Sequence, residues 1–171
     1  LSAGIAAVRD SLPPLARPKI VIHSATGGDN AASRWFYDHL VAYGVDFDVV
    51  GLSHYPWWHG SLWDLKANLH DLAVTYGKEI QVVETAYPWT LDWDDGTHNF
   101  VGSEDQLLPG YEATPEGQLA FLRDILTAVE ATPGVLIPGP GQGSGHRRGL
   151  ASGPHLCSRA VGAGVEPITG P

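Results

Sequence analysis

One carboxylate stands out near the middle of the chain, at Glu84. It ends a short apolar run and is followed closely by Tyr87, Pro88 and Trp89. Such a run is typical of a buried parallel strand, so the pattern predicts an acid delivered to an aromatic-walled cleft. Aromatic rings pack against the C–H faces of a sugar, and a carboxylate can act at its anomeric carbon. The alternative, a strand-end Glu that caps the next helix or meets solvent, is left open by this motif alone.

The elements around Glu84 alternate between strands and helices. We expect strands over residues 19–23, 47–52 and 79–84, and helices over 3–10, 31–43, 62–76 and 115–129. This order predicts an α/β fold with a parallel sheet and helices outside. Ligands bind at the carboxyl ends of such strands, where polar and aromatic residues gather over 23–30, 53–59 and 84–89.

Cap residues mark the predicted helix ends. Ser61 with Asp64 three residues on is typical of a capping box, and Thr114 precedes a proline at the first helical position. Gly44 and Gly77 stand where helices should close.

Composition excludes several classes of partner. The formal net charge is -9 with ten Lys and Arg, and no basic stripe is visible, so we expect no nucleic acid and no anionic membrane as partner. No apolar run approaches the length of a membrane span. The single cysteine, Cys157, excludes an internal disulfide framework and a cysteine-rich zinc site.

The two ends of the chain are unusual. It begins at Leu1 and contains no Met, so we expect residue 1 not to be the natural N-terminus. No signal peptide is visible, but a chain missing its start could not show one. From Val135 the composition becomes rich in Gly, Pro and Arg without a helical or strand period. We therefore predict two regions, 1–134 and an anomalous tail over 135–171, which by composition alone would be a disordered tail or linker.

The motif Val-Val-Glu-Thr-Ala-Tyr-Pro-Trp-Thr over residues 82–90 is highly specific. Further motifs lie at residues 21–23, 28–30, 48–56, 58–62, 64–72 and 113–118. Through these segments, residues 1 to about 134 resemble the endo-β-1,4-galactanases of glycoside hydrolase family 53. The resemblance implies the C-terminal half of a (β/α)8 TIM barrel, incomplete, with strands similar to the fifth, sixth and seventh of eight.

The resemblance also assigns the catalytic chemistry. It makes Glu84 the nucleophile of a retaining hydrolase, whose acid/base is a second Glu in an Asn-Glu pair that this sequence does not contain. This chain alone is then expected to be inactive and, with open sheet edges, to fold poorly. The family's eighth-strand Tyr-Trp-Glu-Pro segment is not found after Gly134, so we interpret the tail as a reading-frame shift, with a divergent tail as the alternative.

The resemblance and the strand-end positions together suggest the residues that bind substrate. Tyr55 is expected to donate its hydroxyl to Glu84 and to help keep the pKa of that carboxyl low. Asp29 and Asn30 are expected to cap a helix first and to contact substrate second. Expected sugar platforms are Trp58, Trp89 and Tyr87, and expected hydrogen-bonding partners of sugar hydroxyls are His23, His54 and His59.

A metal is suggested by one loop. Bacterial relatives hold calcium there, and the candidate ligands in this chain are Asp92, Asp94, Asp95, His98 and Asn99, most of which offer the oxygen atoms that calcium prefers. An acidic, solvated loop is the alternative, and no organic cofactor is expected.

The function implied by the resemblance is cleavage of galactan or arabinogalactan outside the cell by the parent protein. Two alternatives remain: a non-catalytic carbohydrate-binding module, and a retaining hydrolase of the same clan that acts on another polysaccharide.

Overall fold

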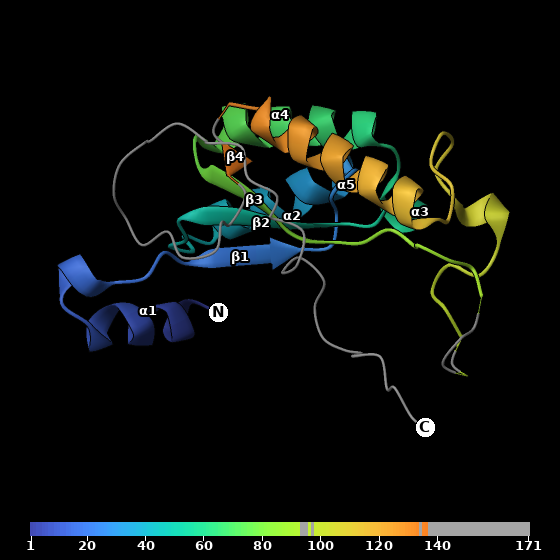
Figure 1. The fold of residues 1–171 in the computed structure, drawn as a ribbon. Coiled ribbons are helices and arrows are strands. Elements are labelled where there is room, and N and C mark those ends of the chain that lie inside the picture. The colour runs from blue at the N-terminus through green and yellow to red at the C-terminus, as the bar shows by residue number, and fades with distance from the viewer. Residues whose placement is uncertain (93–95, 97, 134, 137–171) are drawn as a thin grey trace, which may run out of the picture. The chain divides into compact units, whose positions relative to one another are not determined.

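A four-stranded parallel sheet lies at the centre of the fold. The computed structural model describes residues 1–92, 96, 98–133 and 135–136. Within them the strand order is β1-β2-β3-β4, with β1 at Val21–Ser24, β2 at Val49–His54, β3 at Glu79–Thr85 and β4 at Val135–Leu136 (Figure 1). Every neighbouring pair is parallel, which confirms the predicted α/β class.

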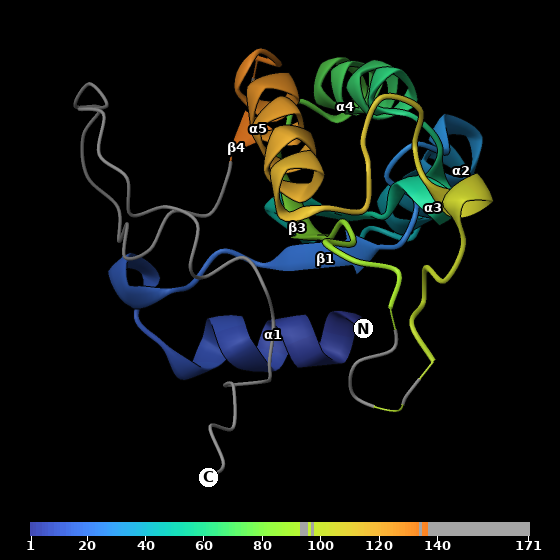
Figure 2. The same ribbon diagram turned by 45° about the vertical axis from the view of Figure 1, so that its right-hand side comes forward.

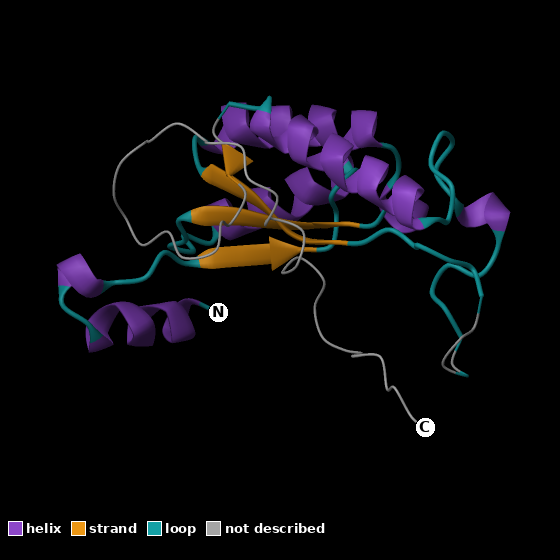
Figure 3. Cartoon of the chain, in the orientation of Figure 1, coloured by secondary structure: helices purple, strands orange, loops and turns teal. Residues whose placement is uncertain are grey.

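Helices pack around the sheet and beside its first strand. The longer helices α2 (Asn30–Ala42), α4 (Leu62–Tyr76) and α5 (Pro115–Glu130) pack against the sheet, and α1 (Ser2–Ser11) lies alongside β1, the edge strand (Figures 1 and 2). Ile5 of α1 belongs to the same core cluster as buried residues of the other three helices. Three short helices sit in the connections: η1 (Pro14–Ala16), α3 (Pro56–His59) and η2 (Glu104–Gln106) (Figure 3). None of the helices in the described ranges is long and apolar enough to cross a membrane.

The helix ends confirm the cap predictions. Ser61 and Asp64 form a reciprocal capping box at the start of α4, and Gly77 closes that helix in the left-handed conformation with φ 58°. The Thr114 side chain accepts the amide of Gly117 at the start of α5. These local contacts satisfy backbone groups that a helix end leaves without partners.

The core lies between the sheet and the helices that cover it. Burying each large apolar side chain there stabilises the fold by about 1.5–3 kcal/mol. The hydroxyl of Tyr37 donates towards the carbonyls of Ile22 and Gly51, so the one polar atom of this buried ring is satisfied. The largest fully buried apolar side chains include Tyr37, Phe47, Phe121, Leu52, Leu65, Leu69, Leu72 and Ile80.

The observed strands differ from the predicted ones in two places that bear on the sheet. Strand β2 continues through Ser53 and His54, which we expected in a loop, because both residues keep pairing with β3. Val135 and Leu136, expected to lack strand structure, pair with Ile80 and Gln81 because the chain returns from α5 to the open edge of β3. The sheet thus extends two residues beyond the predicted boundary at 134, and the rest of the predicted tail, 137–171, lies outside the described residues.

Candidate active site

An irregularity in β3 decides where Glu84 points. Leu52 pairs with Val82, but the next residue, Ser53, pairs with Glu84, so Val83 is an extra residue in the ladder. Side chains alternate between the faces of a strand, so without this bulge Ser53 would lie opposite Val83 instead. The bulge therefore puts the side chains of Ser53 and Glu84 on the same face at the carboxyl end of the sheet.

Two hydroxyl groups hold the exposed Glu84 carboxylate. Ser53 Oγ donates to Glu84 Oε2 at 2.9 Å, and Tyr55 Oη donates to the same oxygen at 3.2 Å. The Tyr55 contact is the hydrogen bond expected from the sequence. The Ser53 contact was missed, because only the register of the bulge brings these two residues together.

These contacts keep Glu84 ionised. The hydrogen bond from Ser53 is the largest cause of the lowered pKa at Glu84. Burial opposes it with the second-largest effect, and the Tyr55 hydroxyl and the nearby His23 lower the pKa further. Burial together with the Glu84 charge raises the pKa of Tyr55, so this hydroxyl keeps its proton as a donor. A carboxylate that is both ionised and exposed can act as a nucleophile.

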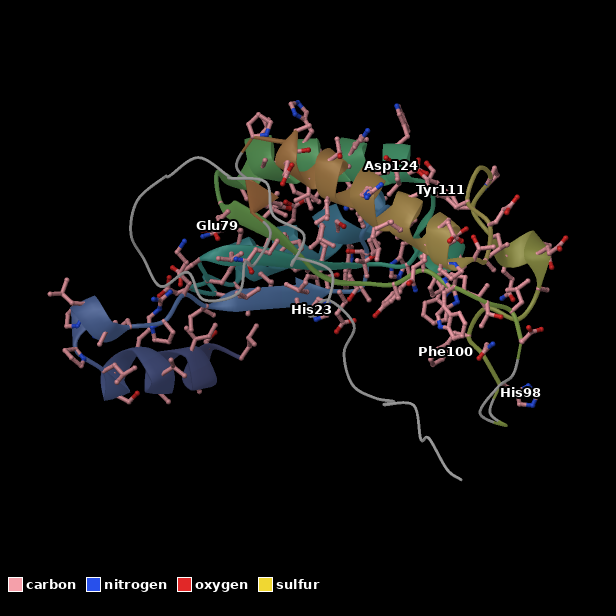
Figure 4. All side chains as sticks on the ribbon, in the orientation of Figure 1. His23, Glu79, His98, Phe100, Tyr111 and Asp124 are labelled. Atoms are coloured by element: carbon pink, nitrogen blue, oxygen red, sulfur yellow. The ribbon has the colours of Figure 1, made fainter. Side chains whose placement is uncertain are left out.

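His23 extends the same chain of contacts. It lies on β1, on the side that faces away from α4 and α5 (Figure 4), and its Nε2 is 2.5 Å from Ser53 Oγ. The imidazole is exposed, and its Nε2 is engaged by the serine. Contact of His23 with a sugar hydroxyl stays a prediction.

Two of the side chains predicted to contact sugar are buried in this structure. His54 is 0% exposed at the end of β2, where its ring packs against Gly27. Tyr87 is 3% exposed, stacks on Phe121 with ring centroids 4.6 Å apart, and donates its hydroxyl to the Tyr111 carbonyl at 2.9 Å. Neither ring is available to a ligand at the sheet edge.

Three further candidates serve the local structure. His59 Nδ1 accepts the amide hydrogen of Tyr55 at 3.0 Å, which fixes the turn that carries this tyrosine. Asp29 caps α2 by accepting the amide of Ala32, as expected. Asn30 does not cap the helix; its amide donates to Asn68 and Asp71 and ties α2 to α4.

Two predicted platforms remain open to solvent. Trp58 is 59% exposed and Trp89 is 53% exposed. Trp58 stands edge-on to Tyr55 at 5.7 Å and to Phe100 at 5.8 Å between ring centroids. Phe100, 80% exposed, was not predicted, because an isolated Phe in a polar loop carries no sequence signal of its place beside Trp58.

The described part of the predicted calcium loop does not assemble a site. Asp94 and Asp95 lie outside the described residues. Among the described ones, no group of three or more His, Cys, Asp or Glu side chains comes together to hold a metal. Within the loop, Asn99 Nδ2 donates to the backbone carbonyl of Asp92 at 2.9 Å, and calcium binding stays a prediction.

Comparison with known proteins decides the family. Residues 1–143 match the model of glycosyl hydrolase family 53. The chain belongs to this family. It is 56% identical over 133 residues to an uncharacterised protein of Niallia circulans, and 38% identical over 138 residues to the arabinogalactan endo-beta-1,4-galactanase of Cellvibrio japonicus. Both alignments cover 36% of the relative, so the chain spans about a third of the length of these proteins.

Solved structures of the family share the fold. The Ignisphaera aggregans GH53 catalytic domain superposes with a TM-score of 0.69 at 40% identity, over 79% of this chain and 38% of that one. A fungal beta-1,4-galactanase superposes with a TM-score of 0.63 at 31% identity, over 80% and 41%. The parallel βα units are therefore an incomplete part of a TIM barrel, and Glu84 lies at the carboxyl end of its strands, where active sites of this fold are built.

Proposed function

We propose that this chain carries the nucleophile of a retaining endo-β-1,4-galactanase, and that Glu84 is that nucleophile. The observation that supports this most is the Glu84 carboxylate itself, which is exposed, has a lowered pKa, and is held through one oxygen by Ser53 and Tyr55. The relative from Cellvibrio japonicus, named an arabinogalactan endo-beta-1,4-galactanase, supports galactan or arabinogalactan as the substrate.

The reaction has two steps. Glu84 attacks C1 of a galactose unit, the bond from C1 to the leaving oxygen breaks, and a glycosyl ester forms on the carboxylate. Water then attacks C1 while the acid of the first step, now deprotonated, takes its proton, and the ester bond breaks to release Glu84. Two inversions at C1 give net retention of configuration.

The leaving oxygen must receive a proton in the first step. The acid that the family resemblance places in an Asn-Glu pair is not in this sequence. We therefore propose that the 171-residue chain alone does not hydrolyse galactan, and that the acid comes from the part of a complete barrel that this chain does not span.

Two exposed tryptophans are proposed to bind the polymer. Trp58 and Trp89 are more than half exposed, and Trp58 lies next to the Tyr55 that contacts Glu84. Aromatic faces of this kind pack against the C–H faces of sugars. We place the reaction outside the cell, because an intact polysaccharide is too large to reach an enzyme inside the cell.

An activated substrate tests the nucleophile without the missing acid. A dinitrophenyl 2-deoxy-2-fluoro-β-galactoside needs no proton on its leaving group, because dinitrophenolate is a stable anion, and the fluorine slows release of the ester. We expect mass spectrometry of the labelled chain to find the fluorogalactosyl group on Glu84. Glu84→Gln should abolish labelling.

The matched control is Glu79→Gln. Glu79 lies on the same strand but at its other end (Figure 4), and it forms an ion pair with Lys19, so this variant should label like the wild type. Absence of label on the folded wild-type chain would contradict the proposal. Galactan binding that is equal in the wild type and in Glu84→Gln, without labelling in either, would instead indicate a carbohydrate-binding module.

A further inference from the structure

Ser53 links His23 to Glu84 and does not itself reach solvent. We propose that Ser53, with its hydroxyl oriented by His23, is a positioning residue that turns Glu84 so that Oε1 is the oxygen that attacks the sugar. This inference rests on the proposed role of Glu84 as nucleophile. It assigns a task to a serine that is 1% exposed and therefore acts through the carboxylate instead of touching the substrate.

Counting protons fixes the direction of the hydrogen bonds. Ser53 Oγ carries one hydrogen and lies 2.9 Å from Glu84 Oε2 and 2.5 Å from His23 Nε2. An ionised carboxylate can only accept, so the serine hydrogen goes to Glu84. Nε2 of His23 must then carry a hydrogen and donate to Ser53 Oγ. The imidazole thereby holds the hydroxyl in the rotamer that points at the carboxylate.

The two carboxylate oxygens of Glu84 differ in their hydrogen-bond partners. Both hydroxyl donors, Ser53 and Tyr55, reach Oε2. Among the residues that the structure describes, Glu84 Oε1 accepts no hydrogen bond. A lone pair on Oε1 is thus free for bond formation, while Oε2 becomes the carbonyl oxygen of the ester and keeps its donors.

The backbone of Ser53 is itself fixed in place. Its carbonyl accepts the amide hydrogen of Gly27 at 2.9 Å, and a Cβ on residue 27 would lie 2.5 Å from that oxygen. The Gly27 carbonyl in turn accepts from the buried amide of Asn68 at 2.8 Å. Together with the bulge at Val83, these contacts leave Ser53 little freedom to move relative to Glu84.

The first experiment measures the pKa of the Glu84 carboxyl directly. Carbon-13 NMR titration of the glutamate-labelled chain reports the pKa of Glu84 without any turnover. The titratable groups that face it are Tyr55 and His23. We expect Ser53→Ala to raise the pKa of Glu84 towards its ordinary value. Ser53→Cys, which keeps the volume but is a weaker donor, should raise it in the same direction.

A matched serine controls for structural damage. Ser24 is also buried at the end of a strand, but its hydroxyl pairs with Thr26, so Ser24→Ala should leave the pKa of Glu84 unchanged. His23→Leu should raise that pKa, and His23→Gln, which keeps an N–H donor, should restore it. An unchanged pKa in both Ser53 variants, or a wild-type pKa at the ordinary value, overturns the proposal.

The second experiment separates positioning from protonation. At pH 7 Glu84 is ionised in both the wild type and Ser53→Ala, so a slower reaction of the variant with the activated fluorogalactoside reports a change in the orientation of the carboxylate. Because a hydrogen bond to a charged group fixes that orientation, loss of the Ser53 hydroxyl should slow the reaction roughly 10- to 100-fold.

The two proposals fail in different ways. If Glu84 is labelled and Ser53→Ala changes neither its pKa nor its rate, the positioning role is wrong and the nucleophile stands. If the Ser53 variants shift the pKa but no label reaches Glu84, the positioning contact is real and the proposed function is wrong.

Discussion

A buried histidine should make this fold sensitive to acid. His54 is 0% exposed, and among the residues that the structure describes neither of its ring nitrogens has a hydrogen-bond partner. Burial, with a smaller effect of the like-charged His59, lowers the pKa of His54 from 6.5 to about 4, while Asp64 acts in the opposite direction. The protonated ring is thus disfavoured in the folded state.

The sign and size of the effect follow from this shift. Between pH 6.5 and about 4 the unfolded chain binds a proton at His54 that the folded chain does not. The contribution of neutral His54 to the free energy of unfolding is therefore present in full above pH 6.5 and is lost as the pH falls towards 4. At about 1.4 kcal/mol per pH unit, the loss from this one residue is about 3 kcal/mol.

Urea unfolding followed by tryptophan fluorescence measures the loss. His54→Phe removes the titrating group. Between pH 7 and pH 4 its free energy of unfolding should therefore fall by about 3 kcal/mol less than that of the wild type. His70→Phe, an exposed histidine on α4, is the control and should follow the wild type. Equal losses in His54→Phe and the wild type would refute the reasoning, since acid sensitivity would then come from other groups.

Three further substitutions test the local structure by the same unfolding assay. Ser61→Ala should cost about 1 kcal/mol, because its hydroxyl accepts the amide of Asp64 at the start of α4; no change would mean that the capping box is not formed in solution. Asn68→Ala should cost about 2–5 kcal/mol, since the buried amide donates to the Thr26 and Gly27 carbonyls; a cost below that of the loop variant Asn99→Ala would contradict this network. Gly117→Ala should cost about 1–3 kcal/mol, because the new Cβ would lie 2.1 Å from the Glu112 carbonyl oxygen; wild-type stability would show that this contact relaxes freely.

The helix ends and the contact between Tyr55 and Glu84 could be predicted because they depend on local signals and on the order of the elements. Ser61 and Thr114 cap their helices through contacts three residues away, and such contacts are visible in the sequence. The approach of Tyr55 to Glu84 followed from placing both at the carboxyl ends of neighbouring parallel strands. These inferences need only the order of the elements.

The misses depend on register and burial. Ser53 meets Glu84 only because Val83 bulges out of the ladder, and a bulge has no signature in a run of valines. His54 precedes Tyr55 and Tyr87 lies two residues before Trp89, in stretches of similar polar and aromatic composition, yet both are buried. Residue type cannot distinguish them, because which face a side chain takes is set by the strand pairing and by what packs on that face.

The most direct test of the nucleophile is chemical rescue in a complete barrel. Residues 1–136 can replace the matching segment of the Cellvibrio japonicus galactanase, to which the chain is 38% identical, so that an acid is supplied from the rest of that enzyme. We predict that this chimera hydrolyses β-1,4-galactan and that Glu84→Ala lowers turnover roughly a thousand-fold or more. Added azide should then restore the reaction with an activated aryl β-galactoside and give α-galactosyl azide, because azide attacks from the side that Glu84 vacates. A β-configured azide product, or undiminished turnover in Glu84→Ala, would contradict the account.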